Sequence, residues 1–266
     1  SFVTKEILIN LNYTKKILKL KYNDPSFISR HLFAITSNKS KAIEYGIDPN
    51  KILTFSKNIP GRFSISSTVS FIVLLQIGKS NFKKFFKGIR RMDASFKNTK
   101  INNNIPMMLA LISIWNINYF SIKNFCVCPY SFRLKDIIEY IQQIEMESNG
   151  KSTNTHSRMI NIDTSPIVFG QEGTDCQHSF FQMIHQGSQD IALDFIGVVE
   201  CNESKVSSNF LISNLIAQAN LCFYGRRSQY NQKTIKGNNP SNIILMNQID
   251  PYTIGNLISL YEHKVF

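Results

Sequence analysis

One acidic residue stands where a helix is expected to end. Glu147 closely precedes Asn149-Gly150, and Asn-Gly is a strong signal for a helix C-terminus. The helix dipole disfavours negative charge at that end, so this carboxylate should take up a proton more readily than an ordinary glutamate. Such a group suits a general base that works near neutral pH. A solvated carboxylate that merely precedes a helix end is the alternative.

An arginine follows a turn signal in the segment Asn58-Ile-Pro-Gly-Arg-Phe-Ser64. We expect Gly61 to let the backbone turn tightly, so that Arg62 lies just before the N-terminus of an apolar helix over residues 64–77. A guanidinium beside unpaired helix N–H groups can bind an anion or stabilise a developing oxyanion. An ordinary surface arginine is the alternative.

A histidine follows a glycine-bearing segment, Gly170-Gln-Glu-Gly-Thr-Asp-Cys-Gln-His178. Thr174 and Gln177 have the spacing of a capping box, which predicts a helix that begins near Thr174. His178 would then lie in the first turns of this helix, below a loop whose N–H groups face a ligand. Cys176 near the same N-terminus could be a reactive thiol, although no partner base is evident.

Apolar periodicity indicates the elements that position these residues. Helices are predicted over residues 26–32, 39–45, 79–91, 134–147 and 176–186, and buried strands over residues 33–36, 52–55 and 165–169. Residues 149–164 and 225–242 are polar and are expected to form surface loops. Strands that alternate with helices predict an α/β sandwich with a mostly parallel sheet.

Length and composition exclude several classes of protein. The chain has 266 residues, of which 43% are hydrophobic and 18% are charged, so it can bury a sizeable core in one large or two smaller domains. Its longest apolar runs, residues 69–77 and 105–115, fall short of the roughly 18 residues that span a bilayer. The net charge of +12 favours anionic partners, although abundant Lys, Ile and Asn also fit an AT-rich genome.

Cysteine usage indicates reduced thiols. The five cysteines, at positions 126, 128, 176, 201 and 222, are odd in number and scattered. This pattern fits a cytosolic protein better than a disulfide framework. Cys126-Val-Cys128 lacks the spacing of a zinc knuckle, so no metal site is predicted.

Taken together, these segments resemble the phosphoglucose isomerase family. The resemblance is carried by residues 58–64, 142–151, 166–170, 173–178 and 185–187, and is supported by residues 45–49, 237–241 and 260–264. It covers essentially the whole chain in the family's order.

The resemblance implies an aldose–ketose isomerase of glycolysis and gluconeogenesis that interconverts glucose 6-phosphate and fructose 6-phosphate. In such an enzyme Glu147 would shuttle a proton between C2 and C1, and Arg62 would steady the enediolate. His178 would open the sugar ring, reaching in from the neighbouring subunit of a homodimer. Further substrate contacts are implied at Ser1, Thr4, Gly61, Gln143, Gly173 and Thr174. No cofactor or metal is implied, because a carbon acid beside a carbonyl needs only a base and stabilisation of the enediolate charge.

The family's architecture implies two sugar-isomerase (SIS) type α/β domains, each a three-layer αβα sandwich with a mostly parallel sheet. Residues 1–75 would complete the first domain, and residues 76–266 would form most of the second. Compared with the family pattern, the chain begins inside the phosphate loop, after a Ser-Lys pair. It ends before a Gly-Val-Glu-Leu-Gly-Lys segment that carries an active-site lysine. We therefore expect these 266 residues alone to be inactive.

Two stretches depart from the family pattern. Residues 60–67 read Pro-Gly-Arg-Phe-Ser-Ile-Ser-Ser where the family usually has Gly-Gly-Arg-Tyr-Ser-Leu-Trp-Ser. Residues 171–176 likewise differ from the usual Glu-Pro-Gly-Thr-Asn-Gly. We expect these changes to leave the reaction type intact, but the sequence does not give the turnover rate.

Two other functions are weighed against the isomerase. A non-catalytic sugar-phosphate-binding protein of the same fold would need neither Glu147 nor His178. Nucleic-acid binding through residues 79–91 would use six basic residues and three phenylalanines, but helical spacing predicts that the phenylalanines face the core. We therefore expect a cytoplasmic enzyme with no nucleic-acid or membrane partner.

Overall fold

The computed structural model describes residues 4–22, 26, 30–200 and 205–266. Residue contacts divide the chain into two compact units, Ser1–Phe82 and Lys83–Phe266. The division falls within helix α4 (Phe71–Asn98). The assignment of residues 1–75 and 76–266 to two family domains stays a prediction.

The first unit contains a small parallel sheet covered by helices. Its elements are α1 (Lys5–Tyr22), β1 (Ala34–Thr36), α3 (Lys39–Glu44), the 3-10 turn η1 (Pro49–Lys51) and β2 (Ile52–Thr54). Ala34 pairs with Ile52 in parallel, and Ala42 and Ile47 are buried beside them. The predicted strands at residues 33–36 and 52–55 and the predicted helix at 39–45 are confirmed. Of the predicted helix at residues 26–32, residues 26, 30 and 31 are helical, and residues 27–29 lie outside the described residues.

Serine side chains interrupt the segment between this sheet and α4. Instead of one helix over residues 64–77, the chain forms two 3-10 helices, η2 (Gly61–Ser66) and η3 (Thr68–Ser70), before it enters α4. The backbone of α4 is non-helical at Gly78 (φ 76°), so the predicted end at residue 77 and the predicted helix over residues 79–91 are confirmed. The hydroxyls of Ser64, Ser67 and Ser70 donate to the carbonyls of Gly61, Ser64 and Ser67 at 2.6–2.8 Å. The prediction of one continuous helix was wrong because these hydroxyls compete for the carbonyls on which an α-helix depends.

The second unit is built on four parallel strands in the order β4-β3-β5-β6. Their bounds are β3 (Asn124–Pro129), β4 (Ile167–Gly170), β5 (Ala192–Val198) and β6 (Ser241–Met246). Cys126 lies opposite Phe169 on one side and Leu193 on the other. Every residue of β5 is buried, as expected for an inner strand of a parallel sheet. The predicted parallel sheet is confirmed.

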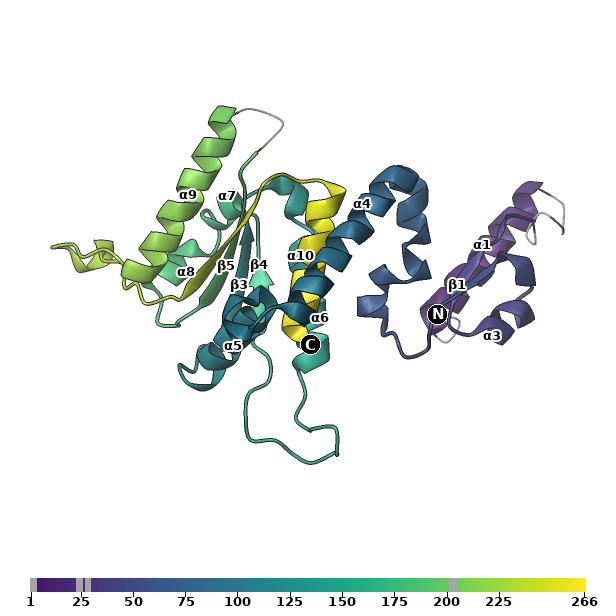
Figure 1. Ribbon diagram of the computed structural model, residues 1–266, viewed down its shortest axis with the longest axis horizontal. Coiled ribbons are helices and arrows are strands. Elements are labelled where there is room, and N and C mark those ends of the chain that lie inside the picture. Colours follow the sequence, from purple (N-terminus) through teal and green to yellow (C-terminus); the bar gives the residue numbers. More distant parts are fainter. Residues whose placement is uncertain (1–3, 23–25, 27–29, 201–204) are drawn as a thin grey trace. The chain divides into compact units, whose positions relative to one another are not determined.

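Helices cover both faces of this sheet, which gives three layers (Figure 1). One face packs on α7 (Gly173–Cys176), α8 (Phe181–Gln186) and α9 (Lys205–Tyr224). The other face packs on α5 (Ile105–Asn118), α6 (Ile137–Asn149) and α10 (Pro251–Val265). The remaining short 3-10 helices are η4 (Ile101–Asn103), η5 (Phe132–Leu134) and η6 (Asn231–Lys233). The expected αβα sandwich is confirmed.

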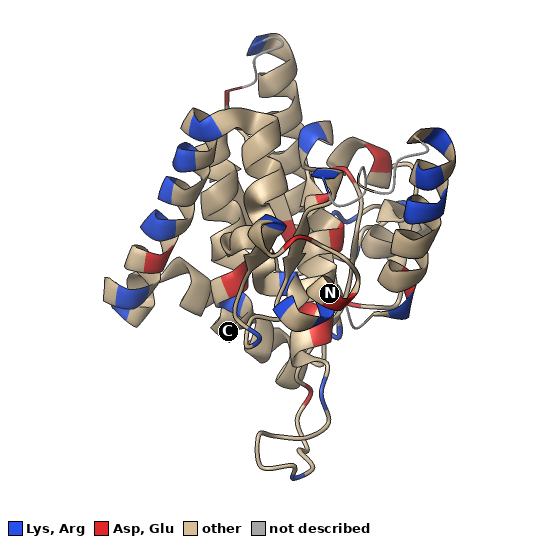
Figure 2. Ribbon diagram, turned by 90° about the vertical axis from the view of Figure 1, so that its right-hand side faces the viewer, with Lys and Arg blue, Asp and Glu red and all other residues tan. Residues whose placement is uncertain are grey.

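The apolar faces predicted from helical spacing are largely buried, with Phe82, Phe86 and Ile137 half-buried. Ile138, Ile141 and Ile144 of α6 are at most 9% exposed, and Phe85 and Ile89 of α4 are nearly inaccessible. The 30 Lys and Arg residues outnumber the 18 Asp and Glu residues, and many of them lie on helices (Figure 2). Among the described residues, no helix is both long and apolar enough to cross a membrane.

Candidate active site

Glu147 lies in the last turn of α6, and its side chain is exposed. The helix ends at Asn149, and the N–H of Gly150 donates to the carbonyl of Met146 at 3.0 Å, so the predicted helix end is confirmed. One turn earlier, Gln143 donates through Nε2 to Oε2 of Glu147 at 3.2 Å. The structure therefore brings together two predicted site residues, a carboxylate and an amide, on the exposed face of one helix.

The adjoining side of α6, about 100° around the helix from Gln143 and Glu147, is fixed to the sheet. Gln142 donates through Nε2 to the carbonyl of Val168 at 2.8 Å, and the N–H of Val168 donates to Sδ of Met146 at 3.4 Å. Ile141 and Ile144 are fully buried behind these contacts. Helix α6, which carries Glu147, is thus attached to β4.

His178 does not lie in the first turns of a helix, so this prediction was wrong. Helix α7 ends at Cys176, and exposed His178 lies in the turn that follows, with its N–H donating to the carbonyl of Asp175 at 2.9 Å. The predicted helix over residues 176–186 is broken by this turn, and α8 begins only at Phe181.

The capping box predicted for Thr174 and Gln177 is absent. The N-cap residue of α7 is Glu172, and its side chain makes no capping hydrogen bond. Gln177 instead donates through Nε2 to Oδ1 of Asn214 at 2.6 Å, and also to the hydroxyl of Tyr130. Gln177 therefore bonds a side chain of α9 and not the backbone at the start of its own helix.

Gly173 allows the backbone to lie against an aromatic ring. A Cβ at this position would meet Cε2 of Tyr130 at 2.2 Å, so only glycine fits. Thr174, half-buried, follows in the first turn of α7. Close packing against the Tyr130 ring is therefore a structural reason for a glycine at position 173.

Gly61 and Arg62 lie within η2, and not before a longer helix as expected. Gly61 has no left-handed backbone conformation, and a Cβ built on it would meet nothing within 4 Å. The expectation that its backbone freedom permits the turn was wrong, because neither backbone nor packing requires a glycine here. Half-buried Arg62 has Cζ 5.5 Å from the ring centroid of Phe63.

The predicted site residues are divided between the two units. Arg62, Gly61 and the exposed Thr4 belong to Ser1–Phe82, and Ser1 itself lies outside the described residues. Glu147, Gln143, His178, Gly173 and Thr174 belong to Lys83–Phe266.

Within the second unit, Glu147 and His178 lie toward opposite edges of the sheet. Helix α6 leads from the carboxyl end of β3 to the amino end of β4, so its last turn lies near the start of β4. His178 follows the carboxyl end of the same strand. Figure 1 shows the end of α6 and α7 at opposite edges. One copy of this unit therefore does not unite the two side chains.

The four thiols that the structure describes do not form a nucleophilic site. Cys126, Cys128, Cys176 and Cys222 are free and buried, and Cys201 lies outside the described residues. A hydrogen bond with Cys128, together with burial, raises the pKa of Cys176, so its thiol stays protonated. Among the described residues, no group of three or more His, Cys, Asp or Glu side chains is arranged to hold a metal ion.

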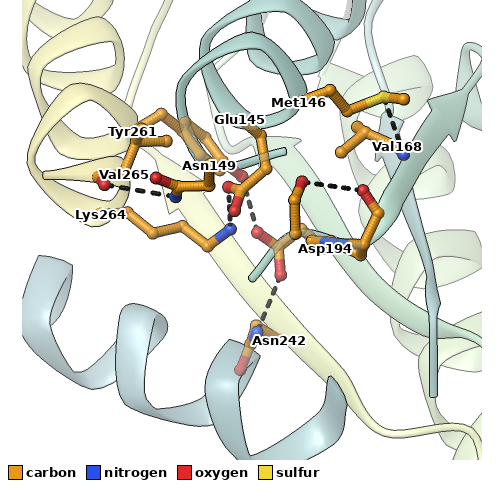
Figure 3. Close-up of polar contacts among 11 residues, drawn as sticks. Glu145, Met146, Asn149, Val168, Asp194, Asn242, Tyr261, Lys264 and Val265 are labelled. Atoms are coloured by element: carbon orange, nitrogen blue, oxygen red, sulfur yellow. Dashed lines mark hydrogen bonds and ion pairs between the residues drawn. The ribbon is translucent and has the colours of Figure 1, made fainter. Parts of the chain in front are cut away.

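A buried charge cluster beside α6 was missed by the sequence analysis. It consists of Glu145, Asp194, Asn242, Tyr261 and Lys264 (Figure 3). Glu145 is 4% exposed, Asp194 1% and Lys264 6%. Glu145 falls on the apolar side of α6, and Asp194 interrupts an apolar run. An acidic residue at an apolar position is the sequence signal that could have indicated a buried charge cluster.

Comparisons with known proteins agree on one family. Residues 1–266 match the family described as phosphoglucose isomerase. A glucose-6-phosphate isomerase of Buchnera aphidicola subsp. Cinara cedri is 39% identical over 282 residues, and one of Methylococcus capsulatus is 34% identical over 286 residues. Each alignment covers all of this chain and 52% of the relative, so the chain spans about half the length of the curated relatives it matches.

Solved structures show the same likeness. A glucose-6-phosphate isomerase from Chlamydia trachomatis matches with a TM-score of 0.90 and 34% identity, over all of this chain and 52% of that one. Hypothetical protein TT0462 from Thermus thermophilus matches with a TM-score of 0.76 at 19% identity, over all of this chain and 63% of that one, which indicates a shared fold.

Proposed function

The chain belongs to the phosphoglucose isomerase family, and from this premise we propose that it forms part of an enzyme that interconverts glucose 6-phosphate and fructose 6-phosphate. The observation that carries the proposal is the exposed pair of Gln143 and Glu147 at the end of α6. A non-catalytic sugar-phosphate-binding protein of this fold is not favoured, because the relatives that match at 34–39% identity are named isomerases.

Glu147 is the base in this proposal. Removal of the C2 proton from open-chain glucose 6-phosphate leaves an enediolate. Return of that proton to C1, with transfer of the O2 proton to O1, gives fructose 6-phosphate. Gln143 holds one oxygen of the Glu147 carboxylate, which limits the orientations available to the base. Arg62 would stabilise the enediolate charge.

The other predicted site residues open the sugar ring or contact the substrate in this proposal. His178 would open the sugar ring, and Ser1, Thr4, Gly61, Gly173 and Thr174 would contact the substrate. The open space around Gly61 supports this role, since a ligand can approach its backbone closely. We place the enzyme in glycolysis and gluconeogenesis in the cytoplasm, where its phosphorylated substrates are made and consumed.

We further propose a homodimer in which His178 of the partner subunit completes the site around Glu147. The support is topological, because the two residues lie toward opposite edges of the sheet in one copy. A two-fold symmetric dimer can pair one edge of each copy with the other edge of its partner, and this arrangement builds two identical sites.

A chimera tests the function. The part of the Chlamydia trachomatis isomerase that aligns with this chain is replaced by residues 1–266, and glucose 6-phosphate formation from fructose 6-phosphate is followed by a coupled dehydrogenase. We expect turnover by the chimera and none by the isolated chain. A folded chimera with no isomerase activity would contradict the proposal.

A further inference from the structure

We infer that buried Lys264 is a positioning residue, which through its ion pair with Glu145 sets the direction in which α6 presents Glu147. This inference rests on the proposed function. Nζ of Lys264, on α10, donates to Oε2 of Glu145, on α6, at 2.6 Å (Figure 3). The two side chains are only 3% and 5% exposed.

The surroundings of Lys264 leave little freedom for its position. Nζ lies 4.6 Å from the ring centroid of Phe125. Beyond it, Asp194 accepts hydrogen bonds at 2.8 Å from Nδ2 of Asn242 and from the hydroxyl of Tyr261. Lys264 is the one cation of the buried charge cluster and faces two carboxylates. Displacement of its ammonium group would leave buried charge uncompensated, which is strongly unfavourable.

Helix geometry carries this constraint to Glu147. Successive residues of an α-helix are about 100° apart around its axis, so Glu145 and Glu147 point about 200° apart. One therefore faces the core and the other faces solvent, as their exposures show. A rotation of α6 that moved Glu147 would pull Glu145 away from Lys264.

Hydrogen bonds from Tyr140 and Asn149 also join described residues of α6 to α10, but neither replaces this ion pair. The hydroxyl of Tyr140 donates to Oε1 of Glu262 at 2.7 Å, almost two turns before Glu147. Nδ2 of Asn149 donates to the carbonyl of Val265 at 3.3 Å, at the very end of the helix. Of these three contacts between described residues, the Lys264–Glu145 pair is the buried ion pair, and it lies within one turn of Glu147.

The test uses the active chimera and three substitutions: Lys264→Met, Glu145→Gln and the double variant. We expect kcat per folded molecule to fall by about tenfold to a hundredfold in Lys264→Met with KM nearly unchanged, since small misplacements of a catalytic group have effects of this size. The double variant also removes the charge of Glu145, so it should recover part of the thermal stability, although Asp194 still lacks a cation, without recovering kcat.

Matched controls are Glu139→Gln, an exposed glutamate of the same helix, and Lys123→Met, which breaks an exposed ion pair with Asp163. Both should retain wild-type kcat. Recovery of kcat in the double variant would overturn the inference, because it would show that only charge compensation matters. A rise in KM with unchanged kcat would overturn it as well.

Amide hydrogen exchange in the isolated chain separates this inference from the proposed function. Lys264→Met should speed exchange in the last turn of α6 more than Lys123→Met does, whether or not the chimera is active. Equal exchange in the two variants would overturn the inference. An inactive wild-type chimera with the expected exchange pattern would count against the isomerase alone.

Discussion

Glu147 and His178 stand at opposite ends of β4, one in the helix that leads to the amino end of the strand and the other in the turn that follows its carboxyl end. Both side chains are exposed, so each is available to a site that is completed from outside its own sheet. Proton transfer and ring opening can therefore be tested as functions that two copies share.

Loss of the carboxylate should stop proton transfer. In the chimera, Glu147→Gln keeps the shape of the side chain but removes the base, so kcat should fall by about two or more orders of magnitude. Incorporation of deuterium at C2 of glucose 6-phosphate, formed from fructose 6-phosphate in heavy water, should fall in parallel. Glu139→Gln is the control, and undiminished exchange in Glu147→Gln would remove this residue from the mechanism.

Two inactive variants should complement each other. A mixed dimer of Glu147→Gln and His178→Ala chimeras contains one site in which both residues are intact, if each site draws one residue from each subunit. Random assortment then restores about a quarter of wild-type activity. The readout is activity after the two variants are dissociated and reassembled together. Activity no greater than that of the separate variants would place both residues in the same subunit's site.

Asp194 should make stability depend on pH. Burial raises the pKa of this carboxyl, although Lys264, Asn242 and Tyr261 favour its ionised form. A carboxyl whose pKa is higher in the folded state binds its proton more tightly there. Its stabilisation is complete below the unfolded pKa of about 3.9 and is lost as pH rises through the folded value.

The comparison is with Asp194→Asn, which does not ionise. The free energy of unfolding of wild type minus that of the variant should decrease as pH is raised from about 4 towards neutrality. Urea unfolding of both proteins over this range measures the difference and cancels the titration of other groups. A difference that is constant or increases with pH would contradict the raised pKa.

Substitution by alanine should affect stability at one glycine and not at another. A Cβ on Gly88 of α4 would meet the carbonyl oxygen of Tyr252 at 2.0 Å, so Gly88→Ala should destabilise the chain by about 1–3 kcal/mol or more. A Cβ on Gly61 meets nothing within 4 Å, so Gly61→Ala should leave the urea midpoint unchanged. In the chimera, Gly61→Ala should instead weaken turnover, and full turnover would remove Gly61 from the substrate contacts.

Local sequence signals were reliable where a residue's neighbours in the chain decide its structure. The apolar spacing of Ile138, Ile141 and Ile144 gave the buried face of α6, and Asn149-Gly150 gave its end. The alternation of strands and helices was enough to predict a parallel sheet with helices on both faces. The motif residues pointed to the family, whose model matches the whole chain.

Tertiary structure decided the features that depend on partners far away in the sequence. Gln177 has the spacing for a capping box, yet it bonds Asn214 on α9, and the helix expected around His178 is broken. Lys264 and Glu145 become an ion pair only because α10 packs against α6. Periodicity and capping signals describe interactions within a few residues. A buried hydrogen bond or charge must be satisfied by whatever the fold brings beside it, and that partner is not written into the local pattern.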